Sequence, residues 1–122
     1  MYIHSHIFDK LISHCKLDPT KESCGLLFGE GKMVDDFHPA INMSEDPHAY
    51  TVDPESTLQL FDKKFLGVYH SHIFIPPVPS NIDLQQANLP GKYYIIYSLK
   101  YNQLRSWLFT GKNFVAVPTK LV

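Results

Sequence analysis

The sequence has 122 residues, 44% hydrophobic and 13% aromatic, so it can fill one globular core but not two. Eleven basic and twelve acidic side chains give a net charge of -1, which excludes the strongly basic surface of a nucleic-acid or anionic-membrane binder. The N-terminus lacks a secretory signal and no apolar stretch could span a bilayer, so we expect a single cytoplasmic domain over residues 1–122.

The first half of the sequence predicts a helix, a hairpin and a second helix. Apolar residues recur at helical spacing over residues 5–16, with Ser5 as a candidate N-cap. Residues 24–38 are typical of two strands joined at a tight Gly-Glu-Gly turn. A polar connection and a short extended piece follow, and Asp53 then begins a helix whose apolar spacing continues to Phe65.

The second half predicts a strand, a short helix and three more strands. Residues 66–72 are rich in apolar and aromatic side chains and indicate a strand. Three prolines in residues 73–79 remove backbone donors, so regular structure stops there. Ser80 opens a short helix that ends at Pro90-Gly91, and the last strands cover residues 92–100, 103–109 and 113–119. This order predicts an α/β domain with a single mixed β-sheet flanked by helices.

Two histidines on the predicted strand are candidates for a metal site. His70 and His72 point to the same side of a strand, because side chains two residues apart share a face. Asp83 lies in the first turn of the next helix and can fold back toward them. Two imidazoles and a carboxylate, with one position left for water, form the open geometry of a catalytic zinc site. A simpler interpretation is that Ser80 and Asp83 form a capping box for this helix.

The string HSHIF, which begins at His70, also begins at His4, but nothing after the first copy completes a metal site. The position eleven residues beyond His6 is Leu17 rather than a metal ligand. His4 and His6 also straddle a predicted helix start, where residues two apart do not face the same way. We expect both side chains to be solvated or to cap the helix.

The residues from His70 to Asp83 resemble the signature of the JAMM, or MPN-plus, metalloprotease family. That signature is His-Ser-His, seven residues, Ser, two residues and Asp, matched here by His70, Ser71, His72, Ser80 and Asp83. Upstream, ESCGLLFG resembles the family stretch E-x-C-G-L-L-x-G and places its glutamate at Glu22. The resemblance covers nearly the whole chain, without the insertions of eukaryotic members. It implies the minimal prokaryotic type of the MPN fold, which is related to that of cytidine deaminases.

The resemblance also implies a role for each residue of the signature. His70, His72 and Asp83 would hold Zn²⁺, and the bound water would have its pKa lowered to about 7. Glu22 would take a proton from this water and return it to the leaving amine. Ser80 would donate to the oxyanion. Ser71, which points away from the metal, would support the local backbone.

Family members of this type cut after the C-terminal Gly-Gly of ubiquitin-like modifiers or small sulfur-carrier proteins, and we expect such a substrate. Its tail would pair with a sheet edge and contact the apolar triplet Ile73-Phe74-Ile75. This triplet stands where the family commonly has a proline, and it is either substrate-facing or buried. We expect a monomer or a small homo-oligomer.

Other interpretations stay open at this point. A non-catalytic MPN scaffold would keep the fold, although all the signature residues are present. Hydrolysis of cell-wall peptides is usually an activity of fused-domain members. A zinc nucleobase deaminase needs His-x-Glu and Pro-Cys-x-x-Cys, neither of which occurs here.

Cys15 and Cys24 are expected to be buried, reduced thiols. Cys24 lies two residues after Glu22 and could instead be a zinc ligand, but a fourth protein ligand would close the site.

Overall fold

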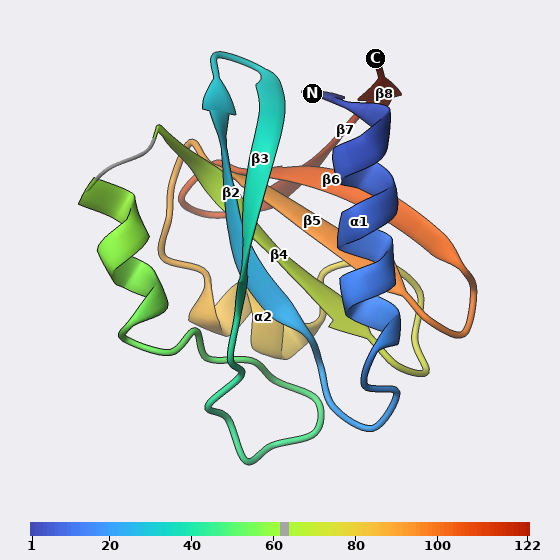
Figure 1. Ribbon diagram of the computed structural model, residues 1–122. Coiled ribbons are helices and arrows are strands. Elements are labelled where there is room, and N and C mark those ends of the chain that lie inside the picture. The colour runs from blue at the N-terminus through green and yellow to red at the C-terminus, as the bar shows by residue number, and fades with distance from the viewer. Residues whose placement is uncertain (62–63) are drawn as a thin grey trace.

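One mixed β-sheet forms the centre of the computed structural model, which describes residues 1–61 and 64–122 (Figure 1). Within these residues the strand order is β7-β6-β5-β4-β2-β3-β1-β8. The strands are β1 (Tyr2–Ile3), β2 (Cys24–Glu30), β3 (Met33–Ala40), β4 (Phe65–His72), β5 (Tyr93–Ser98), β6 (Gln103–Phe109), β7 (Phe114–Val117) and β8 (Lys120–Leu121). The helices are α1 (Ser5–Lys16), the 3₁₀ helix η1 (Ser56–Phe61) and α2 (Asn81–Gln86). The predicted mixed sheet flanked by helices is confirmed.

The two faces of the sheet are covered differently, and strand alternation decides which residues reach each face. On one face, α1 buries Ile7, Leu11 and Cys15 against Leu27 and Tyr69. On the other face a second apolar cluster lies near α2, which sits behind the sheet in Figure 1. Its buried members are Leu26, Phe28, Val68, Tyr94 and Phe109.

Strand β4 is central in the sheet and carries the two candidate histidines at its end. It pairs in parallel with β5 and antiparallel with β2, in a register that places Cys24 opposite His70. His70 and His72 follow Val68 at intervals of two residues, so they share its face, on the side of α2.

The predicted second helix is largely wrong. Its described part is the 3₁₀ helix η1, preceded by a turn in which Thr57 N–H donates to Pro54 O over 3.2 Å. The predicted N-cap is present, because the Asp53 carboxylate accepts from Ser56 N–H over 3.0 Å. Phe65 belongs to β4 instead, opposite Phe28, and residues 62–63 of the predicted helix lie outside the described residues.

Smaller differences occur at the termini of elements. His4, not Ser5, is the N-cap of α1, and the Ser5 hydroxyl donates to the carbonyl of Val122. Helix α2 ends at Gln86, before the predicted stop. The two-residue strands β1 and β8 pair with each other near the two ends of the sequence and were not predicted.

Both cysteines are buried and free, as expected. No helix in the described ranges is long and apolar enough to cross a bilayer.

Gly67 is a glycine at which substitution should be costly to the sheet. A Cβ there would lie 1.9 Å from the carbonyl oxygen of Tyr93, its partner in the β4–β5 ladder. We expect Gly67→Ala to cost about 3 kcal/mol or more of unfolding free energy in urea denaturation. Gly31→Asn is the control, because Gly31 has φ of 61° and open space around it. Equal stability of the two variants would contradict the register of β4 and β5.

Candidate metal centre

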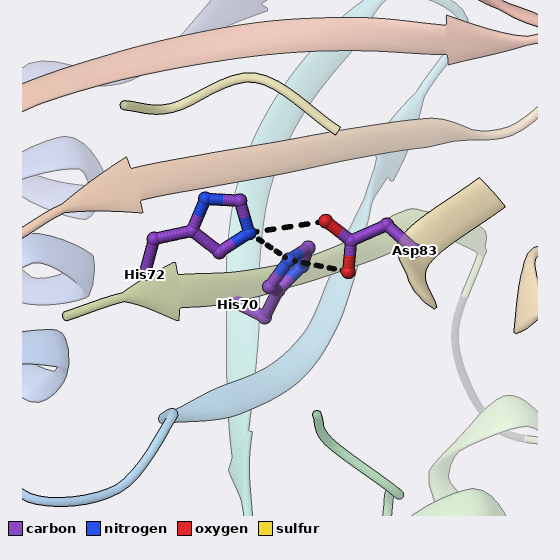
Figure 2. Close-up of side chains that lie close together, drawn as sticks. All are labelled: His70, His72 and Asp83. Atoms are coloured by element: carbon purple, nitrogen blue, oxygen red, sulfur yellow. Dashed lines mark hydrogen bonds and ion pairs between the residues drawn. The ribbon is translucent and has the colours of Figure 1, made fainter. Parts of the chain in front are cut away.

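Three buried side chains from β4 and α2 converge at one point (Figure 2). The Nε2 atoms of His70 and His72 lie 3.2 Å apart. His70 Nε2 is 3.1 Å from Asp83 Oδ1, and His72 Nε2 is 3.0 Å from Asp83 Oδ2. Two nitrogen ligands and a carboxylate that face one another at these distances can hold a metal ion.

The N-terminus of α2 fixes the position of Asp83. Ser80 Oγ accepts from Asp83 N–H over 3.0 Å, and Ser80 N–H donates to Asp83 Oδ2 over 2.8 Å, which makes a complete capping box. The capping interpretation and the metal-site interpretation therefore hold together, because one carboxylate makes both sets of contacts. The Ser80 Oγ is an acceptor in the box, so its hydroxyl hydrogen stays available to another group.

The proline-rich loop after β4 orients the ring of His72. His72 Nδ1 lies 2.8 Å from the carbonyl oxygen of Pro76 and must be the donor, because a carbonyl only accepts. In the neutral ring the Nε2 lone pair then faces the site, as metal binding requires. The adjacent carbonyls of Ile75 and Pro77 accept from Ser98 Oγ over 2.7 Å and from Trp107 Nε1 over 3.1 Å. The loop is therefore tied to the sheet at three consecutive residues.

The electrostatics of the three groups favour an added positive charge. Burial lowers the pKa of His70, despite the opposing effect of Asp83. Burial also acts to lower the pKa of His72, but its bonds to Asp83 and to the Pro76 carbonyl outweigh this effect and raise it. The pKa of Asp83 is lowered, because its hydrogen bonds from the two imidazoles overcome the effect of burial. An ionised carboxylate in a buried position needs a cation or protonated partners.

Glu22, just before β2, is a buried carboxyl group with an unused oxygen. It is 5% exposed, and its Oε1 is buried without a hydrogen-bond partner. Burial raises its pKa to about 8; the charges of Asp83 and Asp46 add to this effect, and His72 opposes it. Such a shift is typical of a catalytic acid–base near neutral pH. An orphaned carboxyl oxygen close to the metal-ligand set fits a site that holds a metal ion and water.

Ser71 connects Glu22 to the histidine strand. Its Oγ accepts from Ser23 N–H over 2.8 Å, and its N–H donates to Ser23 O over 2.9 Å. Ser71 points away from His70 and His72, toward the face covered by α1. This pair of bonds holds the residue next to Glu22 against the end of β4.

Three other candidates lie outside the described metal-ligand cluster. His4 and His6 stack on each other at the start of α1, with ring centroids 5.5 Å apart. Cys24 is fully buried opposite His70, but its sulfur is not among the described ligand atoms that lie within 4.8 Å of one another. Burial, with the charges of Asp53 and Glu22, raises the pKa of the Cys24 thiol to about 12, so the thiol is protonated near neutral pH in the metal-free protein.

The surroundings differ from the expected substrate groove. Within the described residues, β5 and β2 occupy both hydrogen-bonding edges of β4, so a tail could not add a strand directly to β4. In the apolar triplet, Ile73 is half-buried, whereas Phe74 is 69% and Ile75 45% exposed. The triplet is therefore not part of the core.

An apolar cavity of about 380 Å³ lies beside the site, and no sequence pattern indicated it. Its wall includes Leu26, Val68 and Tyr94 of the sheet and also Tyr50. The Tyr50 ring stacks on His70, with centroids 4.4 Å apart and planes 21° apart, so the cavity borders the metal-ligand set. No sequence signal marked Tyr50, because it lies in a segment predicted to be only a connection and a short extended piece.

Sequence comparisons found related proteins. A family model for prokaryotic homologues of the JAB domain matches residues 4–110. A Haloferax volcanii protein named desampylase is 36% identical over 103 residues, which are 74% of this chain and 74% of the relative.

Solved structures match the fold. The solution structure of a Desulfitobacterium hafniense protein has a TM-score of 0.88 and 25% identity, over 99% of this chain and 92% of that one. Another structure is described as JAMM, a metalloprotease-like zinc site in the proteasome and signalosome. It has a TM-score of 0.69 and 22% identity, and the match covers 100% of this chain and 97% of that one. The latter likeness shows that the fold is shared.

Zinc content should depend on the second HSHIF string and not on the first. We expect purified protein to carry about one zinc per chain. His70→Ala, His72→Ala and Asp83→Ala should each remove most of it in elemental analysis, because each takes away one of three ligands. His4→Ala and His6→Ala should bind as much zinc as the unaltered protein. Equal loss from the N-terminal pair would contradict the assignment.

The metal-free protein should become less stable as pH rises because of Glu22. The unfolded chain releases this proton near its ordinary pKa of 4.5, whereas the folded chain keeps it to about pH 8. Between these values the folded state holds more protons, so the unfolding free energy falls with rising pH. In urea denaturation with a chelator at pH 5 and pH 8, Glu22→Gln should lose less stability than the unaltered protein. Identical losses would mean that Glu22 is not buried as described.

Proposed function

The chain belongs to the family of prokaryotic homologues of the JAB domain, and on this premise we propose that it is a zinc isopeptidase acting on a ubiquitin-like or sulfur-carrier protein. One observation carries the proposal: His70, His72 and Asp83 converge within 4.8 Å in a buried position, and the buried Glu22, which has an unpartnered carboxyl oxygen, interacts with the charges of His72 and Asp83. A relative that is 36% identical is named a desampylase, which supports an isopeptidase over a non-catalytic scaffold.

Glu22 and Ser80 would have different roles at the scissile carbonyl. Zinc held by His70, His72 and Asp83 would supply Lewis acidity and make hydroxide available near neutral pH. Glu22 would take the proton of the attacking water and transfer it to the leaving amine, a task for which a raised pKa suits it. Ser80 would donate its free hydroxyl hydrogen to the carbonyl oxygen as negative charge develops there.

The surroundings of the site support a slender, extended substrate tail. The apolar cavity borders His70 through Tyr50 and would receive apolar side chains that precede the terminal glycines. The exposed Phe74 and Ile75 lie just after the ligand His72 and would contact the body of the substrate. Glycine at the last two positions would let the tail backbone approach buried groups that a Cβ would keep at a distance.

This specificity can be tested with a panel of substrates in which different proteins are fused to the C-terminal Gly-Gly of a ubiquitin-fold protein. We expect cleavage directly after the second glycine, detected by mass spectrometry, and no cleavage by the His72→Ala variant. Replacing the penultimate glycine of the substrate with leucine should lower turnover by about 100-fold or more, because its side chain would hold the tail backbone away from the site.

Casein and short cell-wall peptides serve as the comparison substrates. Cleavage of these at a similar rate, or indifference to the glycine replacement, would show a general peptidase and contradict the proposed substrate class.

A further inference from the structure

Asn42 is a buried amide that uses its full hydrogen-bonding capacity. It is 7% exposed and lies in the long connection between β3 and η1. Its Nδ2 donates to the carbonyls of Glu22 and Ala49, over 2.9 and 3.0 Å. Its Oδ1 accepts from the N–H groups of Ser44 and Thr51, both over 3.0 Å. Two donors and two acceptors at one buried point require an amide, since a carboxylate has no N–H and a hydroxyl has too few donors.

The bonds of Asn42 reach two parts of the candidate site at once. The Glu22 carbonyl belongs to the residue whose side chain is the proposed acid–base. Ala49 and Thr51 flank Tyr50 on either side, and the Tyr50 ring stacks on the metal-ligand candidate His70. A single side chain therefore fixes the backbone under Glu22 and the backbone that carries the ring over His70.

We propose that Asn42 is a positioning residue that holds Glu22 and the Tyr50–His70 stack in register with each other. The inference rests on the proposed function for its effect on turnover, but the contacts are independent of that function. Glu22 precedes β2 and Tyr50 lies in a loop, so their relative position depends on a connection between the two segments. Buried groups that are hydrogen-bonded on every side are the means by which proteins orient metal ligands and bases.

The bond between Asp53 and Ser56 provides a matched control for Asn42, because it also holds this connection together. Asp53 is also 7% exposed, and it closes the base of the loop through bonds from Ile41 N–H over 2.8 Å and Ser56 Oγ over 2.6 Å. It has no described hydrogen bond to Glu22 or to the residues flanking Tyr50. Ser56→Ala therefore loosens the loop without removing any described bond of the Asn42 network.

The test compares Asn42→Ala with Ser56→Ala in zinc-loaded protein. Asn42→Ala should lower kcat for a Gly-Gly fusion by about 10- to 100-fold, with KM changed by less than about threefold. In Asn42→Ala, the Tyr50 ring should no longer stack on His70. The NMR chemical shifts of the His70 ring protons should therefore move toward those of a Tyr50→Leu variant. Ser56→Ala should keep both kcat and these shifts. An Asn42→Ala variant that matches Ser56→Ala in both readouts would overturn the proposal.

Asn42→Asp keeps the test decisive if the alanine variant does not fold. Its carboxylate oxygen can still accept from Ser44 and Thr51 N–H, so the loop keeps these two bonds, but the two bonds that Nδ2 donates, to the carbonyls of Glu22 and Ala49, are lost. We expect the kcat defect to remain and the His70 shifts to stay closer to those of the unaltered protein. Unaltered kcat in this variant would also overturn the proposal. If no variant or unaltered protein cuts any substrate, the proposed function fails, while the ring shifts still decide the role of Asn42.

Discussion

The carboxylate of Asp83 is the contact on which the site depends, because it is buried and shared among three groups. One oxygen accepts from Ser80 N–H and lies beside His72 Nε2, and the other lies beside His70 Nε2. The same contacts start α2 and join it to the end of β4. Removing the carboxylate would take away one of the two bonds of the capping box and leave two buried imidazoles facing each other, so here the fold and the chemistry use the same atoms.

The buried polar groups of the site destabilise the fold, which explains why a cation would fit there. Glu22 and His70 each have a buried polar atom without a partner, next to an apolar cluster that includes Val68 and Tyr94. Unpaired buried polar groups and raised carboxyl pKa values destabilise a fold, and proteins concentrate them where they serve a reaction. The positive charge of a metal ion held by the three ligands would favour the ionised forms of Asp83 and Glu22 and so offset part of this cost. The apolar surroundings would strengthen its electrostatic effect on a bound substrate.

The sequence predicted features that rest on local spacing. The period of apolar residues located α1, and alternation placed His70 and His72 on one face, with Asp83 in the following turn. Tertiary contacts decided the features that were missed. The parallel pairing of β1 with β8 joins opposite ends of the chain, and no local pattern records it. Phe65 continued a helical spacing but packs as the first residue of β4.

Residues 41–43 show the clearest limit of pattern reasoning. Apolar character would place Ile41 and Met43 inside and Asn42 outside, yet Ile41 is 66% and Met43 58% exposed while Asn42 is buried. The amide is inside because four backbone groups need it there, one just before β2 and three in the connection between β3 and η1.

The most direct test of the account is the activity and zinc content of Glu22→Gln, measured on the same preparation. The amide keeps the shape of the side chain but cannot accept a proton, so cleavage of a Gly-Gly fusion should fall by about two to four orders of magnitude. Zinc should stay at about one per chain, because Glu22 is not among the three converging ligands. Activity near that of the unaltered protein, or loss of the metal, would contradict the assignment of Glu22 as the acid–base of a zinc isopeptidase.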